Sequence, residues 1–374
     1  MNYKNIAIIY DDLYQKGGGE NLYLFIVNKI FPKSVLYVPI VAKDFREDVT
    51  ISTRLYYSKV LTFIAEKFGK YGYYLASLLS VFWFESLNFS KCGVVISLSN
   101  RFSHCVITQP DTKHISIITS PFRILWEKNE FNNFIIPHFL KFLRFHNYNS
   151  ARRADKLIAI SSYVQNKIRK RWHLNSVVLN PPLIKFQSSM SQKKTIDLRL
   201  QERVTLENVQ NKYFLVVGRL NAWKSPYFEK VFRIFQENQS SNFYLLKVIG
   251  DGPFMKKFIT RYRRIEFLGR VSSKEMSYVY RRAIALIHPQ VEDFGLTPLE
   301  SLYHGVPVIA YKKGGVLDYL NSKVCLFYKS EAELLRSINM AKEFRLDTNE
   351  VQRILKIHSE ENFGYNLKKL IQNT

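Results

Sequence analysis

The chain has 374 residues, including 55 Lys+Arg and 31 Asp+Glu, which gives a formal net charge of +24. Hydrophobic residues make up 47% and charged residues 23%, so the composition excludes a disordered chain, a collagen-like repeat and a coiled coil. This length predicts two domains, or three. Cys92, Cys105 and Cys325 lie far apart, which argues against a disulfide scaffold or a cysteine zinc site and fits a reducing, cytoplasmic compartment.

Two segments bear on membrane and nucleic-acid binding. The first ten residues lack the long apolar stretch of a secretory signal. Residues 71–84 are uncharged but shorter than the roughly 20 residues of a membrane-spanning helix, so a buried or interfacial helix is expected there. Nine lysines and arginines between residues 141 and 171 accompany a single acidic residue, Asp155. Such a stretch attracts phosphates of lipid, substrate or nucleic acid, or it is a solvated helix face.

The N-terminal half alternates short apolar strands with helices. Continuous runs rich in isoleucine and valine are typical of parallel strands that are covered on both faces, and they occur at residues 6–10, 35–40, 94–98, 115–118 and 157–160. Helical spacing of apolar residues covers residues 21–31, 59–89, 137–154 and 163–172. Ser161 is the expected N-cap of the last of these helices.

A polar stretch then separates a second alternation. Strands are expected at 213–217, 244–249, 266–268, 285–288 and 308–311, and helices at 226–238, 254–262, 273–282, 298–304 and 349–372. Two such runs predict an α/β protein with two doubly wound parallel sheets, facing each other across a cleft that holds the site. The expected division is an N-terminal domain at 1–185, a linker region at 186–210, a C-terminal domain at 211–348 and C-terminal helices at 349–374, with packing of these helices on the N-terminal domain as one option.

The most informative segment, EDFGLTPLE at 292–300, follows an expected strand. Thr297 is a candidate N-cap, Pro298 the first helical residue and Glu300 the third residue of a capping box. The same helix start would aim its free backbone N–H groups at a phosphate. Glu292 would then accept hydrogen bonds from sugar hydroxyls.

This segment resembles the E-x7-E signature of retaining glycosyltransferases of the GT-B fold, glycosyltransferase family 4 (group 1). Further segments resemble family elements in the same chain order: Gly18-Gly19-Glu20, Ser120-Pro121-Phe122-Arg123 with Trp126, Gly218-Arg219-Leu220 with Lys224, Gly250-Asp251-Gly252-Pro253, Phe267-Leu268-Gly269-Arg270-Val271, and Gly305-Val306-Pro307-Val308-Ile309-Ala310 followed by Gly314-Gly315. The resemblance covers residues 6 to 320. It implies two Rossmann-like domains, with the acceptor on the first and the nucleotide sugar on the second.

The resemblance also implies roles for individual residues. Glu300 would hold the ribose, Arg219 and Lys224 the pyrophosphate, and Glu292 the donor sugar; Glu292, Arg219 and Lys224 are the catalytic candidates. The other donor-binding candidates are Phe294, Gly295, Leu296, Thr297, Val271, Gly18 and Gly19. Weaker sugar or acceptor contacts are Arg123, Ser120 and Thr119. Thr119 stands where many members have a histidine, and it can donate a hydrogen bond but carries no charge near neutral pH.

The resulting hypothesis is a cytoplasmic enzyme, peripheral on the inner face of the plasma membrane. It would move a hexose, mannose from GDP-mannose as the first choice, to a lipid-linked or polysaccharide acceptor in O-antigen or capsule synthesis. No metal site or cofactor beyond the nucleotide sugar is implied, and the pair Asp11-Asp12 is interpreted as a loop or cap. The alternatives are another GT-B enzyme, a sugar-nucleotide epimerase or phosphorylase, and a non-catalytic basic protein that binds nucleotides or, less favoured, nucleic acid.

Overall fold

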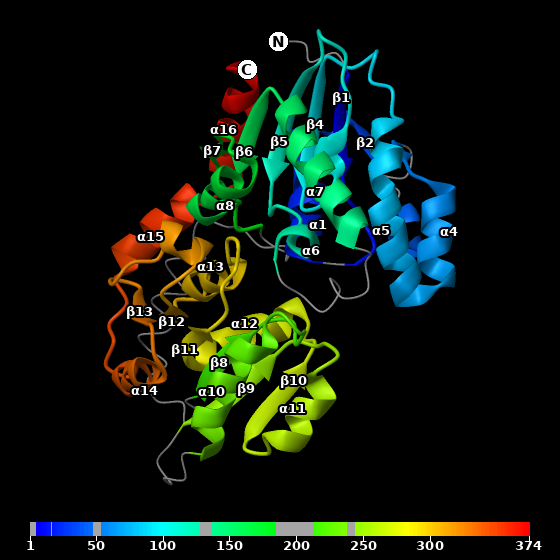
Figure 1. Cartoon of the computed structure of the whole chain (residues 1–374). Coiled ribbons are helices and arrows are strands. Elements are labelled where there is room, and N and C mark those ends of the chain that lie inside the picture. Colours follow the sequence, from blue (N-terminus) through cyan, green and yellow to red (C-terminus); the bar gives the residue numbers. More distant parts are fainter. Residues whose placement is uncertain (1–4, 16, 48–53, 128–136, 185–212, 238–243) are drawn as a thin grey trace. The chain divides into compact units, whose positions relative to one another are not determined.

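The computed structural model describes residues 5–15, 17–47, 54–127, 137–184, 213–237 and 244–374. Two compact units make up the chain, Met1–Ile184 with Glu360–Thr374, and Lys185–Ser359. Each unit is a parallel sheet covered by helices (Figure 1), which confirms the predicted α/β class. The predicted linker at 186–210 lies outside the described residues.

The first unit contains, among the residues that the structure describes, a seven-stranded parallel sheet of order β3-β2-β1-β4-β5-β6-β7. Its strands are β1 Ile6–Tyr10, β2 Val35–Tyr37, β3 Leu55–Tyr56, β4 Val94–Ser99, β5 Lys113–Ile118, β6 Lys156–Ala159 and β7 Val177–Val178. Every residue of β1 is buried because helices cover both faces of the sheet. The edge strands β3 and β7 have two residues each, too few for a sequence pattern to predict.

The helices of the first unit follow the predicted spacing with one break. They are α1 Gly18–Phe25, continued by a π-helix Ile26–Ile30, then α2 Lys43–Arg46, α4 Lys59–Lys67, α5 Gly69–Glu85, α6 Arg123–Trp126, α7 Pro137–Ser150, α8 Ser162–Trp172 and α16 Glu360–Gln372. The single helix expected at 59–89 is two helices because Gly69 has φ +53° and redirects the chain. Ser161 caps α8, as predicted, with its Oγ 3.0 Å from the Val164 nitrogen.

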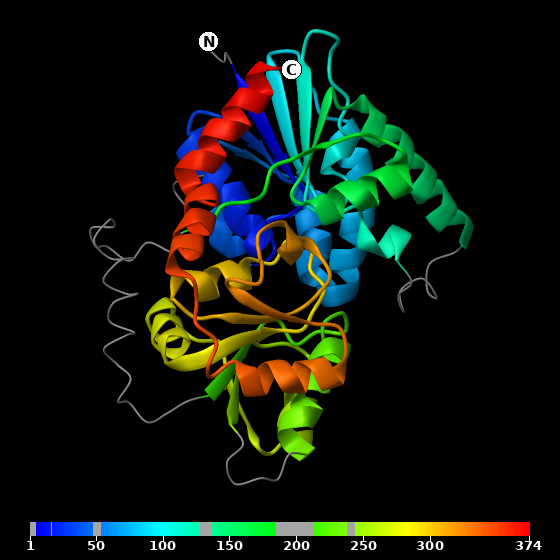
Figure 2. The ribbon, with the colours of Figure 1, turned by 90° about the vertical axis from the view of Figure 1, so that its left-hand side faces the viewer.

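The C-terminal segment is divided between the two units. Helix α15, Thr348–Ile357, belongs to the second unit and α16 to the first. Figure 2 shows α16 lying along the first unit. There the Phe363 ring lies 6.1 Å from the Phe25 ring, and the Lys156 Nζ donates to the Leu370 carbonyl at 2.9 Å. The option that the terminal helices pack on the N-terminal domain therefore describes α16 but not α15.

The second unit contains, within its described part, a six-stranded parallel sheet of order β10-β9-β8-β11-β12-β13. The strands are β8 Tyr213–Val217, β9 Leu245–Ile249, β10 Ile265–Gly269, β11 Ala283–His288, β12 Val308–Tyr311 and β13 Cys325–Tyr328. The helices are α10 Ser225–Glu237, α11 Met255–Arg261, α12 Ser273–Arg282, α13 Leu296–Tyr303, α14 Glu331–Met340 and α15. Aromatic rings dominate the core between β8, α10 and α11, with Phe232 packed edge-on against Phe258 at 5.3 Å. The sequence pattern did not predict β13 or α14.

In each sheet two neighbouring strands mark the point where the strand order reverses. In the first unit these are β1 and β4, and in the second β8 and β11. Ligands of open parallel sheets bind outside the carboxyl ends of strands at such a point. The residues that follow these four strands are therefore the candidates for function.

Candidate functional site

In the second unit the carboxyl end of β11 brings together side chains that are far apart in the sequence. Lys224, in the loop between β8 and α10, donates through Nζ to the Glu292 carboxylate, and Gln290 Nε2 lies 3.5 Å from the same oxygen. Burial opposes the ionisation of Glu292, but the charges of Lys224 and His288 and the hydrogen bonds from Lys224 and Gln290 outweigh it and lower its pKa to about 2. Glu292 is therefore a carboxylate at neutral pH, neutralised by one lysine.

The start of α13 lies against this ion pair. Contrary to prediction, Thr297 is not the N-cap: the helix begins at Leu296, and Gly295 is the capping residue, with φ +90°. A glycine is required because this φ is strained for other residues and because a Cβ would lie 2.7 Å from Val316 Cγ1. The same Cβ position is 3.5 Å from Glu292 Oε2, so the first turn of α13 is adjacent to the carboxylate.

Glu300 lies on the second turn of α13 and makes no capping box. Instead its Oε2 accepts a hydrogen bond of 3.2 Å from the Tyr280 hydroxyl, which comes from α12. Burial raises the pKa of Glu300 above its ordinary value, against the lowering effect of this hydrogen bond, and the charge of Glu292 raises it further. Because α13 starts two residues earlier than predicted, the Glu300 carboxylate is free to interact with groups outside the helix terminus.

Sequence reasoning missed His288, the last residue of β11. Its side chain is 1% exposed, and neither ring nitrogen has a hydrogen-bond partner among the residues that the structure describes. Burial lowers the pKa of His288 to about 4, so the imidazole is neutral at pH 7. A Cβ added to Gly295 would lie 3.5 Å from His288 Nε2 and 3.5 Å from Glu292 Oε2. A histidine at the end of an apolar strand was the only signal, and it does not reveal which way the ring points.

The remaining predicted residues of this unit surround the same strand ends. Arg219 is exposed directly after β8, in the loop that also carries Lys224. A Cβ at Gly250 would lie 1.9 Å from the Gly218 carbonyl oxygen, so the G-x-G-P turn is glycine-rich because it packs on the backbone of the Arg219 loop. Val271 is half-buried at the side of the core beneath β8. The turn before α13 contains Phe294, and the first turn of α13 contains Leu296 and Thr297.

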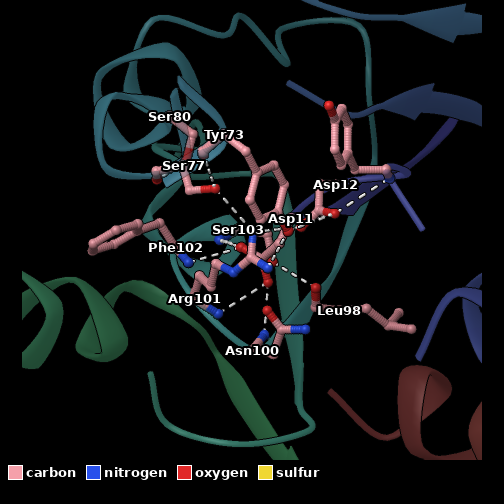
Figure 3. Close-up of polar contacts among 11 residues, drawn as sticks. Asp11, Asp12, Tyr73, Ser77, Ser80, Leu98, Asn100, Arg101, Phe102 and Ser103 are labelled. Carbon is pink, nitrogen blue, oxygen red and sulfur yellow. Dashed lines mark hydrogen bonds and ion pairs between the residues drawn. The ribbon is translucent and has the colours of Figure 1, made fainter. Parts of the chain in front are cut away.

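The first unit carries a polar cluster at its own strand reversal (Figure 3). The Asp11 carboxylate follows β1 and accepts backbone N–H groups at 2.6 to 3.0 Å from the loop after β4, namely Asn100, Arg101, Phe102 and Ser103. Four donors on one buried carboxylate fix this loop. The interpretation of Asp11 as a structural loop residue therefore agrees with the contacts.

Asp12 joins the same loop to α5. Arg101 contacts the Asp12 carboxylate and donates to the Tyr73 hydroxyl at 2.6 Å and to Ser77 Oγ at 3.1 Å, while Tyr73 donates to Asp12 at 3.2 Å (Figure 3). The charges are paired within the cluster. Burial and the Asp12 charge raise the pKa of Tyr73, against the opposing effect of Arg101, so its hydroxyl stays protonated.

The other predicted residues of the first unit follow β1 and β5. Gly18 is the first residue of α1, and a Cβ at Gly19 would lie 2.6 Å from the Tyr10 hydroxyl, so Gly19 leaves room for that ring. Thr119 donates to the Ser99 carbonyl at 3.2 Å, and the buried Ser120 hydroxyl donates to the Pro121 carbonyl at 3.2 Å. Arg123 is the first residue of α6. Their contact with a donor or acceptor stays a prediction.

The described parts of the chain contain no group of three or more histidine, cysteine, aspartate or glutamate side chains that could hold a metal ion. The polar groups at the strand ends of the second unit are instead lysine, arginine, backbone N–H groups and two carboxylates. Cations and helix N-termini bind anions, and carboxylates accept hydrogen bonds from hydroxyls. The arrangement suits a ligand that has both a phosphate and hydroxyl groups.

Comparison with known proteins agrees with this chemistry. Residues 199–348 match the family described as "Glycosyl transferases group 1". An alpha-1,3/1,6-mannosyltransferase of Eremothecium gossypii is 37% identical over 59 residues, 16% of this chain and 12% of that protein. The corresponding enzyme of Dictyostelium discoideum is 39% identical over 56 residues, 15% of this chain and 13% of that protein. The chain thus aligns with only about an eighth of the length of these relatives.

Solved structures resemble the whole chain at low sequence identity. Anabaena HepE, solved in complex with UDP-glucose, has a TM-score of 0.66 at 16% identity, with 99% of this chain and 100% of that chain covered. The sucrose-phosphate synthase of Thermosynechococcus elongatus has a TM-score of 0.67 at 14% identity, covering 99% and 98%. A lipopolysaccharide outer core galactosyltransferase has a TM-score of 0.64 at 15% identity, covering 99% of both chains. Residues 199–348 therefore resemble the glycosyl transferases group 1 family, and the chain as a whole has the GT-B fold.

Proposed function

We propose that this protein is a retaining glycosyltransferase that moves a hexose from a nucleoside diphosphate sugar to a lipid-linked or polysaccharide acceptor in surface-glycan synthesis. The observation that carries the proposal is the Lys224–Glu292 ion pair beside the Gly295 cap of α13, inside the residues that match the family. The local matches to mannosyltransferases favour mannose, with GDP-mannose as donor. The likeness to a lipopolysaccharide galactosyltransferase is consistent with a surface glycan of the O-antigen or capsule kind.

In this proposal the donor diphosphate occupies the strand ends of the second unit. The N–H groups of Leu296 and Thr297 are in the first turn of α13, where the helix has no internal acceptor for them and favours an anion. Lys224 and Arg219 supply positive charge. Glu292, ionised at neutral pH, accepts hydrogen bonds from the sugar, and Glu300 holds the ribose.

The transfer breaks the bond between the anomeric carbon and the distal phosphate oxygen and forms one bond, from that carbon to the acceptor oxygen, on the same face of the sugar. The acceptor hydroxyl gives its proton to the departing phosphate oxygen. Lys224 and Arg219 stabilise the negative charge that develops on this phosphate, a task that needs no bound metal. Trapping of a covalent sugar–enzyme adduct would overturn this front-face route and leave the transfer itself in place.

The donor is identified by calorimetric titration of the full chain with GDP, UDP, GDP-mannose, UDP-glucose and UDP-N-acetylglucosamine. We expect Glu300→Gln to weaken binding of the nucleotide diphosphate and of the nucleotide sugar alike, by about tenfold or more, because a hydrogen bond to the ribose is lost. Glu292→Gln should weaken binding of the nucleotide sugar. It should leave binding of the nucleotide diphosphate as tight or tighter, because Lys224 loses the carboxylate that competes with the diphosphate. Glu331→Gln, the same change on an exposed helix, is the control and should alter neither.

Four results would each favour one of the alternatives. Nucleotide-sugar binding without transfer to any isolated lipid-linked or polysaccharide acceptor would favour a non-catalytic nucleotide-binding protein. Absence of binding to all five ligands, together with DNA binding that weakens steeply with salt, would favour a nucleic-acid-binding protein. Conversion of a nucleotide sugar to its epimer, or release of sugar phosphate from a glycan and inorganic phosphate, would identify the other GT-B reactions.

A further inference from the structure

Helix α5 of the first unit presents large apolar side chains to solvent on one of its faces. Tyr71, Leu75 and Phe82 are 80%, 51% and 55% exposed, and their spacing places them on the same side of the helix. The opposite side, with Ala76 and Phe84, is buried in the core. A helix that is apolar all round is normally buried on all sides, so this exposed face is unusual for a protein in water.

The neighbouring helix α4 and the turn after it also present large apolar side chains to solvent. Val60 and Phe63 on α4 and Phe68 at the α4–α5 turn are each more than half exposed. Helix α4 packs against α5, as Figure 1 shows. Together Val60, Phe63, Phe68, Tyr71, Leu75 and Phe82 are named the aromatic face.

Helix α7 adds further rings beside α5. Phe142 and Phe145 are exposed, and Phe139 stacks on Phe142 at 6.4 Å. The two helices are joined where His146 on α7 lies 2.9 Å from the Glu85 carboxylate at the end of α5. The same unit therefore presents exposed rings on α4, α5 and α7.

The charges on this surface are positive. Lys67 Nζ lies over the rings of Phe63 and Phe68, at 5.2 and 5.7 Å from their centroids, and Lys70 is exposed in the same turn. The two acidic residues of the 54–90 segment are already paired: Glu66 with Arg46 at 2.7 Å, and Glu85 with His146 of α7 and with Arg153 in the turn after it. The lysines thus keep their charge available to a partner.

We propose that the aromatic face, with α7 beside it, docks on an anionic lipid surface. Aromatic rings and lysines on one helical face are the combination that binds the boundary between headgroups and acyl chains, the rings entering it and the lysines attracting anionic headgroups. A second copy is disfavoured as the occupant because each chain carries +24 and would bring lysines against lysines. No helix in the described parts of the chain could span a membrane, so the proposal is for docking along the surface. It does not rest on the proposed transfer reaction.

The test is flotation of the full chain with vesicles of 30% phosphatidylglycerol in phosphatidylcholine, against pure phosphatidylcholine, in 50 mM and 500 mM NaCl. We expect the protein to float with anionic vesicles in low salt and to lose most of that binding in high salt. The triple variant Phe68→Ser, Tyr71→Ser and Leu75→Ser should reduce the bound fraction at least tenfold. The double variant Lys67→Gln and Lys70→Gln should remove the preference for phosphatidylglycerol.

The matched control replaces three exposed apolar residues of the second unit, with Ile259→Ser, Tyr278→Ser and Met340→Ser, and should float like the unchanged protein. All variants change exposed side chains, and circular dichroism with thermal melting establishes that they fold. The proposal is overturned if the unchanged protein does not float, if the first triple variant floats equally well, or if light scattering shows that this variant converts a dimer to a monomer. Nucleotide titrations of the same variants report on the transferase proposal separately, because the vesicles contain no donor or acceptor.

Discussion

The buried imidazole of His288 makes the stability of the second unit depend on pH. The pKa of His288 is lowered from 6.5 to about 4 by burial, with Lys224 lowering it further and Glu292 opposing the shift. Between these two values the unfolded chain binds a proton that the folded chain does not, so stability falls as the pH falls from 6.5 towards 4. Between pH 7 and pH 5, proton binding at this one residue lowers the free energy of unfolding by about 2 kcal/mol.

Replacing the imidazole with an apolar side chain should abolish this dependence. His288→Leu has a similar volume and removes two ring nitrogens that have no hydrogen-bond partner among the described residues, so at pH 7 its stability should equal or exceed that of the unchanged protein. The difference in unfolding free energy in favour of the variant should be about 2 kcal/mol larger at pH 5 than at pH 7.

Urea unfolding at both pH values, followed by fluorescence and circular dichroism, measures the difference. His138→Leu removes an imidazole from the exposed side of α7 and is the control. Equal losses of stability between pH 7 and pH 5 in the unchanged protein and in His288→Leu would refute the assignment of a neutral, buried imidazole. Stability lost at both pH values would mean instead that the ring makes an essential contact, for example through an ordered water.

Three further substitutions test other parts of the structure. The side-chain oxygen of Asn147 accepts hydrogen bonds from the indole N–H groups of Trp126 and Trp172, each at 3.1 Å. Asn147→Leu should therefore lower the free energy of unfolding, measured in urea, by about 2–4 kcal/mol. A loss below about 0.5 kcal/mol would contradict these contacts. Gly295→Ala should lower the free energy of unfolding by about 1–3 kcal/mol and weaken nucleotide-sugar binding. Gly69 also has a positive φ, but a Cβ placed there would have no atom within 4 Å. Gly69→Ala should therefore lower the free energy of unfolding by about 1–2 kcal/mol and leave binding unchanged. Equal binding by the two glycine variants would argue against a ligand at the start of α13.

Much of the fold follows from local patterns. The buried strands β1, β4, β5 and β6 were predicted from runs of isoleucine and valine, because a strand covered on both faces must be apolar at every position. The Ser161 cap was predicted because a cap depends only on residues within one turn. Four residues of the GT-B pattern, Lys224, Glu292, Gly295 and Glu300, could likewise be named from the order of motifs along the chain.

What the sequence alone determined was therefore the alternation of strands and helices and the identity of the candidate residues. Only the tertiary structure decided how they meet. The Lys224–Glu292 pair joins positions 68 residues apart, and it forms because strand order places β8 beside β11. The start of α13 at Gly295 depends on packing against Val316, and the orientation of His288 depends on the loop above its strand. Local propensity fixes an element from its neighbours in the chain, whereas ion pairs, helix starts at close contacts and buried rings depend on neighbours in space.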